Sequence, residues 1–159
     1  PKEFEKLLNK PLPDLQLRTL ESDAIPFIPL TNSKPTVINI WATWCPPCLK
    51  ELPSLKALYH TGEVNVVTIA IDRDVTPIRA QIRSTGTLDL PVLWDSLGKE
   101  VRKHWAANTL PVSYVLDSKG NLRAVEVGER VWEHPQMISK IKKLTKVKAD
   151  EGTDKEVAK

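Results

Sequence analysis

The sequence has few of the residues from which protein metal sites are usually built. Its 159 residues include two cysteines, three histidines and one methionine. A structural zinc site needs four ligands, usually two cysteine pairs or one pair with two spaced histidines. Here a second cysteine pair is absent, and His60, His104 and His134 are scattered along the chain. We therefore expect no metal site.

Long apolar runs and a strong net charge are also absent. No apolar run approaches the about 18 residues that a membrane-spanning helix needs, so no membrane span is predicted. Residues 1–10 carry a charge at nearly every second position, which is unlike a secretion signal. The 23 basic and 20 acidic residues give a net charge of +3, and no basic cluster is interleaved with aromatic residues. Nucleic acid is therefore not an expected partner.

The chain does contain a closely spaced cysteine pair directly after a β-branched run. Residues 37–52 read VINIWATWCPPCLKEL. The first part of this segment predicts a buried strand, and the second part predicts a helix that begins at the cysteines. Cys45 is expected at the helix N-cap and Cys48 one turn later, within reach of a disulfide. A CxxC pair in this setting is typical of thiol–disulfide chemistry.

The start of a helix favours a thiolate at Cys45. Unpaired backbone N–H groups and the positive end of the helix dipole stabilise an anion at this position. Because the thiolate is the form that attacks a disulfide, we expect Cys45 to be the nucleophile. Cys48, one turn deeper, is the predicted resolving thiol.

Two prolines between the cysteines weaken this stabilisation. Pro46 and Pro47 occupy the first two helical positions and carry no N–H, which leaves chiefly the N–H of Cys48 beside the Cys45 sulfur. We therefore expect a thiolate that is less stabilised than in sites with a polar residue between the cysteines. A less stabilised reduced form is a weaker oxidant, which favours a reductase.

Other interpretations of the pair stay open. The cysteines could form an inert disulfide, or they could serve a disulfide oxidase or isomerase. A copper-binding thiol module is a further alternative because soft thiolates suit Cu(I), although Met137, the single methionine, is remote from the pair in the sequence. A peroxidase is disfavoured because Ala42 stands where its threonine is usual.

Strand and helix patterns alternate through the middle of the chain, which predicts an α/β sheet with helices on both faces. The segment 25–30 contains two prolines and is expected to be an edge strand. Thr76 and Pro77 are predicted as the N-cap and first position of a helix. Other expected strands cover 15–17, 37–41, 64–71, 90–94, 112–116 and 122–127, the last two as an antiparallel hairpin, and other expected helices lie near 2–9, 97–106 and 137–144. One domain is expected over residues 1–147, followed by a disordered tail at 148–159.

Several blocks in this order resemble the thioredoxin fold, and more narrowly the TlpA/ResA/DsbE-like group of extracytoplasmic thiol–disulfide oxidoreductases. The resemblance covers residues 11 to about 145. It is carried by NIWATWCPPC at 39–48, ELP at 51–53, LPVLWD at 90–95, TLPVSYVLD at 109–117, Gly120 and Gly128. It implies a thioredoxin-like mixed sheet with an N-terminal extension and a C-terminal hairpin plus helix. The redox-active Cys45–Cys48 disulfide would then act without another cofactor.

The resemblance also implies residues that bind a partner. Pro111 matches a cis proline that lies against the disulfide in this group. The backbone of Leu110 would then be free to pair with an extended substrate segment in the manner of a β-strand. Trp44 would flank the nucleophile as an apolar platform. With Val112, these residues would form a mainly apolar surface suited to a partly unfolded or extended protein.

A proton acceptor for the second cysteine is expected away from the usual position. Asn39 stands where thioredoxins keep a buried acid, and an amide cannot take up a proton. The TlpA/ResA group resembles this chain in that respect and uses an acid elsewhere. The candidates here are Asp72, Asp74 and Glu51, and the competing expectation for each is a solvated surface carboxylate.

The resemblance implies protein thiols and disulfides as partners and a membrane thiol transporter domain as electron donor. It implies a periplasmic or otherwise extracytoplasmic location, with anchoring through a segment outside this chain as an option. Proteins of the cytochrome c biogenesis branch often have an acidic residue after the cis proline. This chain has Val112 at that position.

Overall fold

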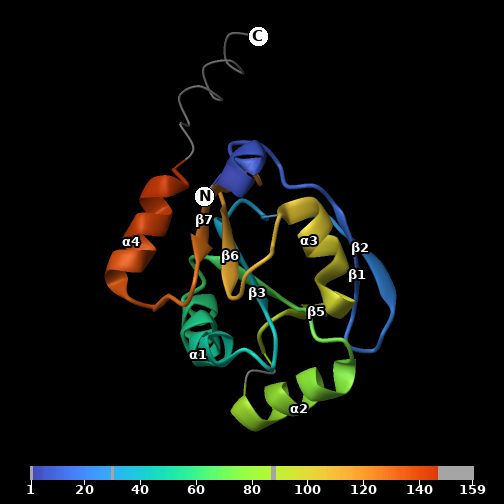
Figure 1. The fold of residues 1–159 in the computed structure, drawn as a ribbon. Helices are drawn as coiled ribbons and strands as arrows, with labels where there is room; N and C mark the ends of the chain where they lie inside the picture. The colour runs from blue at the N-terminus through green and yellow to red at the C-terminus, as the bar shows by residue number, and fades with distance from the viewer. Residues whose placement is uncertain (1, 30, 87–88, 147–159) are drawn as a thin grey trace.

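The computed structural model describes residues 2–29, 31–86 and 89–146, and in this part of the chain a seven-stranded sheet runs in the order β2-β1-β5-β4-β3-β6-β7 (Figure 1). The strands are β1 (Leu15–Arg18), β2 (Ala24–Phe27), β3 (Thr36–Trp41), β4 (Asn65–Ala70), β5 (Val92–Trp94), β6 (Val112–Leu116) and β7 (Leu122–Val127). The helices are η1 (Lys2–Leu7), α1 (Pro46–His60), α2 (Val75–Thr85), η2 (Ser96–Gly98), α3 (Lys99–Trp105) and α4 (Pro135–Leu144). The predicted tail, 148–159, lies outside the described residues, and the single-domain prediction for 1–147 stays a prediction.

The strand that leads to the cysteines lies inside the sheet. All six residues of β3 are buried, as its β-branched sequence predicts. On one side β3 pairs with β4 in parallel, and on the other side it pairs with β6 in antiparallel. A parallel pair needs a long connection, which α1 provides between β3 and β4. The predicted mixed sheet is therefore confirmed, and its inner strand β3 ends at the CxxC segment.

Helices cover both faces of this sheet, as predicted. Neighbouring side chains of a strand point to opposite faces. On one face, the ring of Tyr114 packs edge-on against Phe4 of η1, and its hydroxyl donates to the carbonyl oxygen of Trp105 in α3. On the other face, the hydroxyl of Ser113 accepts a hydrogen bond from Asn39, whose amide also reaches a side chain of α1. Among the described residues, no helix has the length and apolar character of a membrane span.

Two details of the elements test the sequence patterns. β2 is an edge strand that pairs with β1 and contains Pro26, as predicted. The predicted start of α2 is wrong by two residues. Its N-cap is Asp74 rather than Thr76, which places Pro77 at the third helical position. Proline is tolerated there because the N–H groups of a first turn have no acceptor within the helix.

Candidate active site

The two cysteines form a disulfide where β3 passes into α1. Cys45 has extended backbone angles and is the N-cap of α1, while Pro46 and Pro47 are its first two residues. The Cα atoms of Cys45 and Cys48 are 5.3 Å apart. The predicted N-cap position of Cys45 and the predicted reach between the cysteines are therefore confirmed.

The two cysteines differ in their access to solvent. Cys48 is fully buried, whereas Cys45 keeps 6% of its surface exposed and lines a groove of about 370 Å³. The prolines that follow Cys45 have no N–H, and the N–H of Leu49 donates to the carbonyl oxygen of Cys45 rather than to its sulfur. A molecule that approaches through the groove therefore meets Cys45 before Cys48.

The groove joins the CxxC segment to the end of α3 and to the loop before β6. Trp44, which is 62% exposed, stands on the Cys45 side, and Leu110 is half-buried. The nine lining residues are Trp44, Cys45, Pro46, Ile71, Arg102, Ala107, Asn108, Thr109 and Leu110. The chain thus brings together two of the predicted binding residues and the predicted nucleophile.

The peptide bond between Leu110 and Pro111 is cis, as the resemblance implies. The carbonyl oxygen of Pro111 accepts a hydrogen bond from the N–H of Gly128. No backbone hydrogen bond in the described part of the chain uses the N–H or carbonyl of Leu110. The prediction that Val112 contributes to an apolar surface is wrong. Val112 is fully buried because it begins β6 and pairs with Ile40 of β3.

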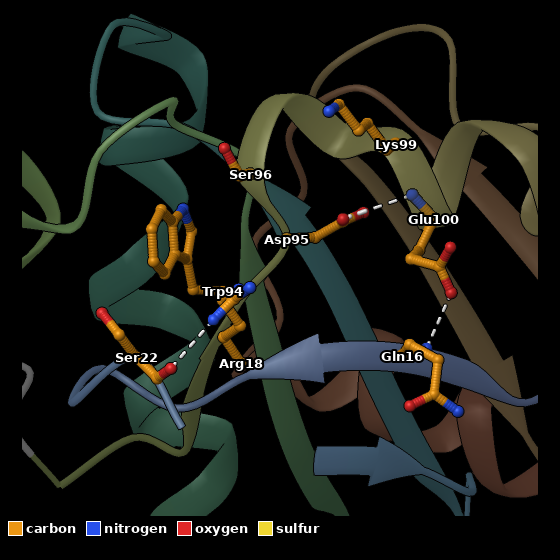
Figure 2. Close-up of a pocket in the computed structure, with 8 residues that line it drawn as sticks. All are labelled: Gln16, Arg18, Ser22, Trp94, Asp95, Ser96, Lys99 and Glu100. Atoms are coloured by element: carbon orange, nitrogen blue, oxygen red, sulfur yellow. Dashed lines mark hydrogen bonds between the residues drawn. The ribbon is translucent and has the colours of Figure 1, made fainter. Parts of the chain in front are cut away.

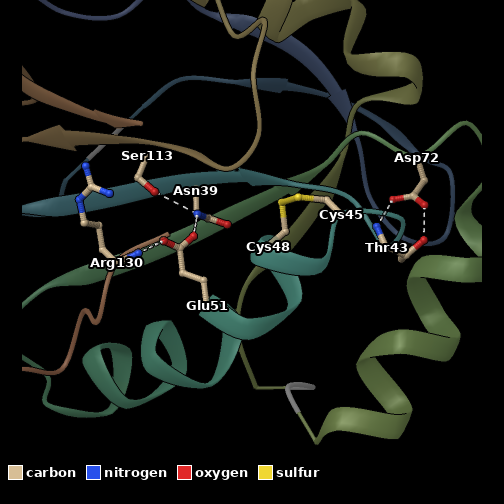
Figure 3. The surroundings of a disulfide bond; sticks show 8 residues. All are labelled: Asn39, Thr43, Cys45, Cys48, Glu51, Asp72, Ser113 and Arg130. Atoms are coloured by element: carbon tan, nitrogen blue, oxygen red, sulfur yellow. Dashed lines mark hydrogen bonds between the residues drawn. A yellow bond between two sulfur atoms is a disulfide. The ribbon is translucent and has the colours of Figure 1, made fainter. Parts of the chain in front are cut away.

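Glu51 lies in a buried polar network behind the disulfide (Figure 3). It is 1% exposed, so the expectation of a solvated carboxylate is wrong for this residue. Its Oε1 accepts a hydrogen bond from Asn39 Nδ2 at 2.7 Å. Its Oε2 accepts from the backbone N–H of Arg130 at 2.8 Å and from Trp132 Nε1 at 2.9 Å. Loss of water around the carboxylate is thus offset by three donors.

Burial raises the pKa of Glu51 above its ordinary value. Removal of water disfavours the charged form and is the largest cause of this shift. The hydrogen bonds from Trp132, Arg130 and Asn39, together with the positive charge of Arg130, act in the opposite direction. The net direction is upward, so Glu51 binds a proton more readily than an exposed glutamate does.

Asn39 bridges Glu51 and Ser113 on the Cys48 side of the disulfide (Figure 3). Its Nδ2 donates to Glu51 and, at 2.9 Å, to Ser113 Oγ. Figure 3 shows its Oδ1 pointing toward the sulfur of Cys48. This oxygen is buried and has no hydrogen-bond partner among the described residues. The amide thus holds Glu51 and leaves its unpaired oxygen on the side of the buried cysteine.

The other two acid candidates have different surroundings. Asp72 is 4% exposed, so the expectation of a solvated carboxylate is wrong here too. It accepts hydrogen bonds from the backbone N–H and the hydroxyl of Thr43, at 3.0 and 2.5 Å, on the other side of Cys45 (Figure 3). Asp74 is exposed and makes no side-chain cap to α2. The structure thus places only Glu51 on the Cys48 side of the disulfide.

The donors that hold Glu51 were not predicted from the sequence. Trp132 and Arg130 come from the loop after β7, about 80 residues further along the chain. One signal for the burial of Glu51 was available. Glu51 follows Cys48 by three positions and precedes Leu55 by four, which places it on the buried face of α1.

A larger hollow of about 510 Å³ lies elsewhere, between β1, β5 and the start of α3 (Figure 2). Its charged groups are partly engaged with one another, since Glu100 accepts from the N–H of Gln16 and Arg18 donates to the carbonyl of Ser22. No cysteine lines it. Among the described residues, no group of three or more histidine, cysteine, aspartate or glutamate side chains is placed to hold a metal ion.

The fold and the disulfide at the end of its central strand define a thioredoxin-fold protein with a redox CxxC pair. The family model described as Redoxin matches residues 7–145. The chain is 30% identical to sporulation thiol-disulfide oxidoreductase A of Bacillus subtilis (strain 168), over 70% of this chain and 69% of that protein. It is 32% identical to thiol-disulfide oxidoreductase ResA of Bacillus thuringiensis (strain Al Hakam), over 87% and 79%.

Solved structures show the same fold. The crystal structure of StoA from Bacillus subtilis has a TM-score of 0.62 and 26% identity, over 84% of this chain and 96% of that one. The chain belongs to the Redoxin family, among the thiol–disulfide oxidoreductases. The family resemblance and the enzyme class predicted from the sequence are thereby confirmed.

Proposed function

We propose that this protein reduces disulfide bonds in protein partners, with Cys45 as the nucleophile and Cys48 as the resolving thiol. The observation that carries this assignment is the unequal access of the two cysteines. Cys45 borders the groove, whereas Cys48 is fully buried behind it. A partner disulfide can therefore reach only one of the two sulfurs directly.

The exchange proceeds in two steps that conserve atoms and electrons. The Cys45 thiolate attacks one sulfur of the partner disulfide, forms a mixed disulfide and releases the other partner sulfur as a thiolate. Cys48 then loses its proton and attacks the Cys45 sulfur, which closes the Cys45–Cys48 bond and releases the second partner thiolate. Two electrons pass to the partner, whose sulfurs end as thiols. A dithiol donor must reduce the Cys45–Cys48 bond before the next cycle.

Glu51 is the proposed proton acceptor for Cys48. Its buried position and raised pKa suit a group that takes up a proton and gives it back. Asn39 supports this role because its amide bonds Glu51 and points its Oδ1 toward the Cys48 sulfur. Asp72 is less suited because both of its hydrogen bonds hold Thr43. Asp74 is exposed at the start of α2.

The partner is proposed to be an extended or partly unfolded protein segment. The unused backbone groups of Leu110 can pair with such a segment, and the exposed ring of Trp44 offers it an apolar surface. The cis bond before Pro111 belongs to the same loop. No cofactor beyond the cysteine pair is needed for this exchange.

The direction of electron flow is proposed from the helix start. Pro46 and Pro47 provide no N–H to the Cys45 sulfur, which leaves its thiolate less stabilised than in sites with a polar residue between the cysteines and makes the disulfide a weaker oxidant. We place the protein outside the cytoplasm, in the periplasm or an equivalent compartment, where a membrane thiol transporter domain would supply electrons. A role in cytochrome c biogenesis is one form of this activity.

The reduction potential of the Cys45–Cys48 disulfide tests the direction. We expect a value near that of thioredoxin, about −270 mV, in equilibrium with a glutathione or dithiol buffer. A value near the oxidising extreme, about −120 mV, would instead indicate a disulfide-forming oxidase. Reduction of insulin with dithiothreitol as donor tests the activity itself, and refolding of scrambled ribonuclease tests the isomerase alternative.

A further inference from the structure

We propose that the groove beside Cys45 selects partner segments with a carboxylate near the reacting cysteine, and that Arg102 recognises this carboxylate. The inference rests on the proposed function and adds a specificity residue to it. Arg102 is the only charged residue among the nine that line the groove. The other lining residues are apolar or uncharged, so a single positive charge determines which charge the groove accepts.

The positive charge of Arg102 is not neutralised by an ion pair. None of the ion pairs within 4.0 Å in the described part of the chain includes Arg102. Its positive charge also acts on Asp95, a buried carboxylate that already accepts the N–H groups of Glu100 and Val101 at the start of α3. The exposed guanidinium therefore keeps its donors for a ligand that enters the groove.

The side chain of Arg102 passes close to Gly98 at the wall of the groove. A Cβ built on Gly98 would lie 3.4 Å from Arg102 Nε and 3.3 Å from Cγ2 of Ile71. Arg102 thus lies over a position without a side chain, beside Ile71, which also lines the groove. A guanidinium at this place can bind a carboxylate through two parallel hydrogen bonds.

The occupant that these contacts fit is an extended peptide with an acidic residue. Cys45 would bind the partner cysteine, and the backbone of Leu110 can pair with the segment around it. Arg102 is placed to bind a carboxylate of the same segment. A simpler role for Arg102 is to complement the negative end of α3, where it stands in the last turn with Lys103 and His104. Lys103 shares that role but does not line the groove, so it provides a matched control.

The test uses the reduced protein and symmetric disulfide dimers of short capped peptides. The peptides are identical except for Glu, Gln or Lys placed two residues before or two residues after the cysteine. Single-turnover reduction is followed by alkylation of the released thiols and chromatography. Each rate constant is divided by that for dithiothreitol with the same peptide, which removes the intrinsic effect of the charge on the disulfide.

In the wild type we expect the Glu peptide to react about three- to fivefold faster than the Gln peptide at one of the two positions. This ratio should fall to about one in Arg102→Gln and at high salt, and Arg102→Glu should favour the Lys peptide. Lys103→Gln should keep the wild-type ratio. Circular dichroism and thermal unfolding confirm that each variant is folded.

Equal rates for Glu and Gln peptides at both positions in the wild type would overturn the proposal. It would equally be overturned if Arg102→Gln kept the preference, or if Lys103→Gln lost it to the same extent, since a general field would then be responsible. Failure of the reduced protein to reduce any peptide would count against the proposed function, whereas equal reduction of all peptides would count against the role of Arg102 alone.

Discussion

One carboxylate lies on each side of the disulfide, and both are buried. They differ in the residues that donate hydrogen bonds to them. Glu51, on the Cys48 side, is 1% exposed, and Asp72, on the Cys45 side, is 4% exposed. Glu51 accepts hydrogen bonds from three residues distant in the sequence. Asp72 accepts two hydrogen bonds from a single residue, Thr43, which precedes Trp44 and Cys45 in the sequence.

Burial alone therefore does not separate Glu51, the proposed proton acceptor, from Asp72. The donors around Glu51 belong to the buried side of the site, and burial still raises its pKa. The donors to Asp72 belong to the loop that presents Trp44 and Cys45 to the groove, so Asp72 is suited to hold that loop in place. We therefore expect changes on the Cys48 side to alter chemistry and changes at Asp72 to alter stability.

The largest effects are expected from substitution of the two cysteines. Cys45 borders the groove and Cys48 is buried, so the two substitutions should have different consequences. Cys45→Ser and Cys48→Ser should both abolish catalytic turnover of insulin. Cys48→Ser should accumulate a mixed disulfide with the partner. The thiol of Cys45 still attacks the partner disulfide, and the variant has no second thiol to release the partner. Non-reducing electrophoresis and mass spectrometry of trapped complexes provide the measurement. Accumulation by Cys45→Ser instead would reverse the assignment of the two roles.

The next effect separates the two carboxylates. Glu51→Gln should slow the resolving step by about 100-fold near neutral pH, because Cys48 loses its proton acceptor. The deficit should be smaller at a pH low enough to protonate Glu51 in the wild type. The deficit should shrink as the pH rises, since hydroxide then ionises the thiol without help. Stopped-flow measurement of disulfide exchange against pH gives the profile.

The matched control for this prediction is Asp72→Asn, which also replaces a buried carboxylate beside the disulfide with an amide. Its pH profile should keep the wild-type shape. A profile that changes in Asp72→Asn but not in Glu51→Gln would assign the proton acceptor to the other side of the site.

The comparison also shows which parts of the site local sequence patterns could predict. The strand before Cys45, the N-cap position of Cys45 and the reach to Cys48 depend on residues close together in the sequence, and the patterns predicted them. The resemblance predicted the cis bond before Pro111. The burial of Val112 was missed because the strand ladder with β3 begins at that residue.

The burial of the two carboxylates depends on contacts distant in the sequence. The donors Arg130 and Trp132 reach Glu51 from about 80 residues away, and Asp72 reaches Thr43 across 29 residues. No local pattern contains such pairs. The helical spacing of Glu51 from Cys48 indicates a buried face. It does not identify the hydrogen-bond donors that offset the cost of removing water from a buried carboxylate.

Substitution of Asp72 should change stability more than chemistry. Asp72→Ala removes the acceptor for the N–H and the hydroxyl of Thr43, which should lower the free energy of unfolding by about 2 to 3 kcal/mol. Asp72→Asn should lower it by less than about 1 kcal/mol, because the amide oxygen still accepts the N–H and the amide nitrogen can donate to the hydroxyl. Urea denaturation measures both. A loss below about 1 kcal/mol in both variants would show that the hydrogen bonds contribute little, whereas a loss of about 2 to 3 kcal/mol in both would show that the charge of the carboxylate is needed.

The raised pKa of Glu51 should be visible in the pH dependence of the free energy of unfolding. Its pKa is raised on folding, so above the ordinary value of 4.5 the folded protein binds this proton more tightly than the unfolded chain. The contribution of Glu51 to stability should therefore fall as the pH rises from about 4.5 through its raised pKa and then level off. Glu51→Gln should lack this component, whereas Asp72→Asn should retain it. Urea denaturation at a series of pH values checks the sign, and a component that rises with pH would contradict it.

The smallest effect is expected at Trp44, in the groove beside Cys45. Because Trp44 is 62% exposed, Trp44→Ser should change the free energy of unfolding by less than about 0.5 kcal/mol. It should lower kcat/KM for a protein substrate about fivefold by raising KM, since the proposed contact of the ring is with the partner rather than with the reacting sulfurs. A small disulfide such as oxidised glutathione should be reduced at the wild-type rate. Val131→Ser is the matched control, because Val131 is 59% exposed and does not line the groove. A similar loss in both variants would show that general surface hydrophobicity, rather than the wall of the groove at Cys45, holds the partner.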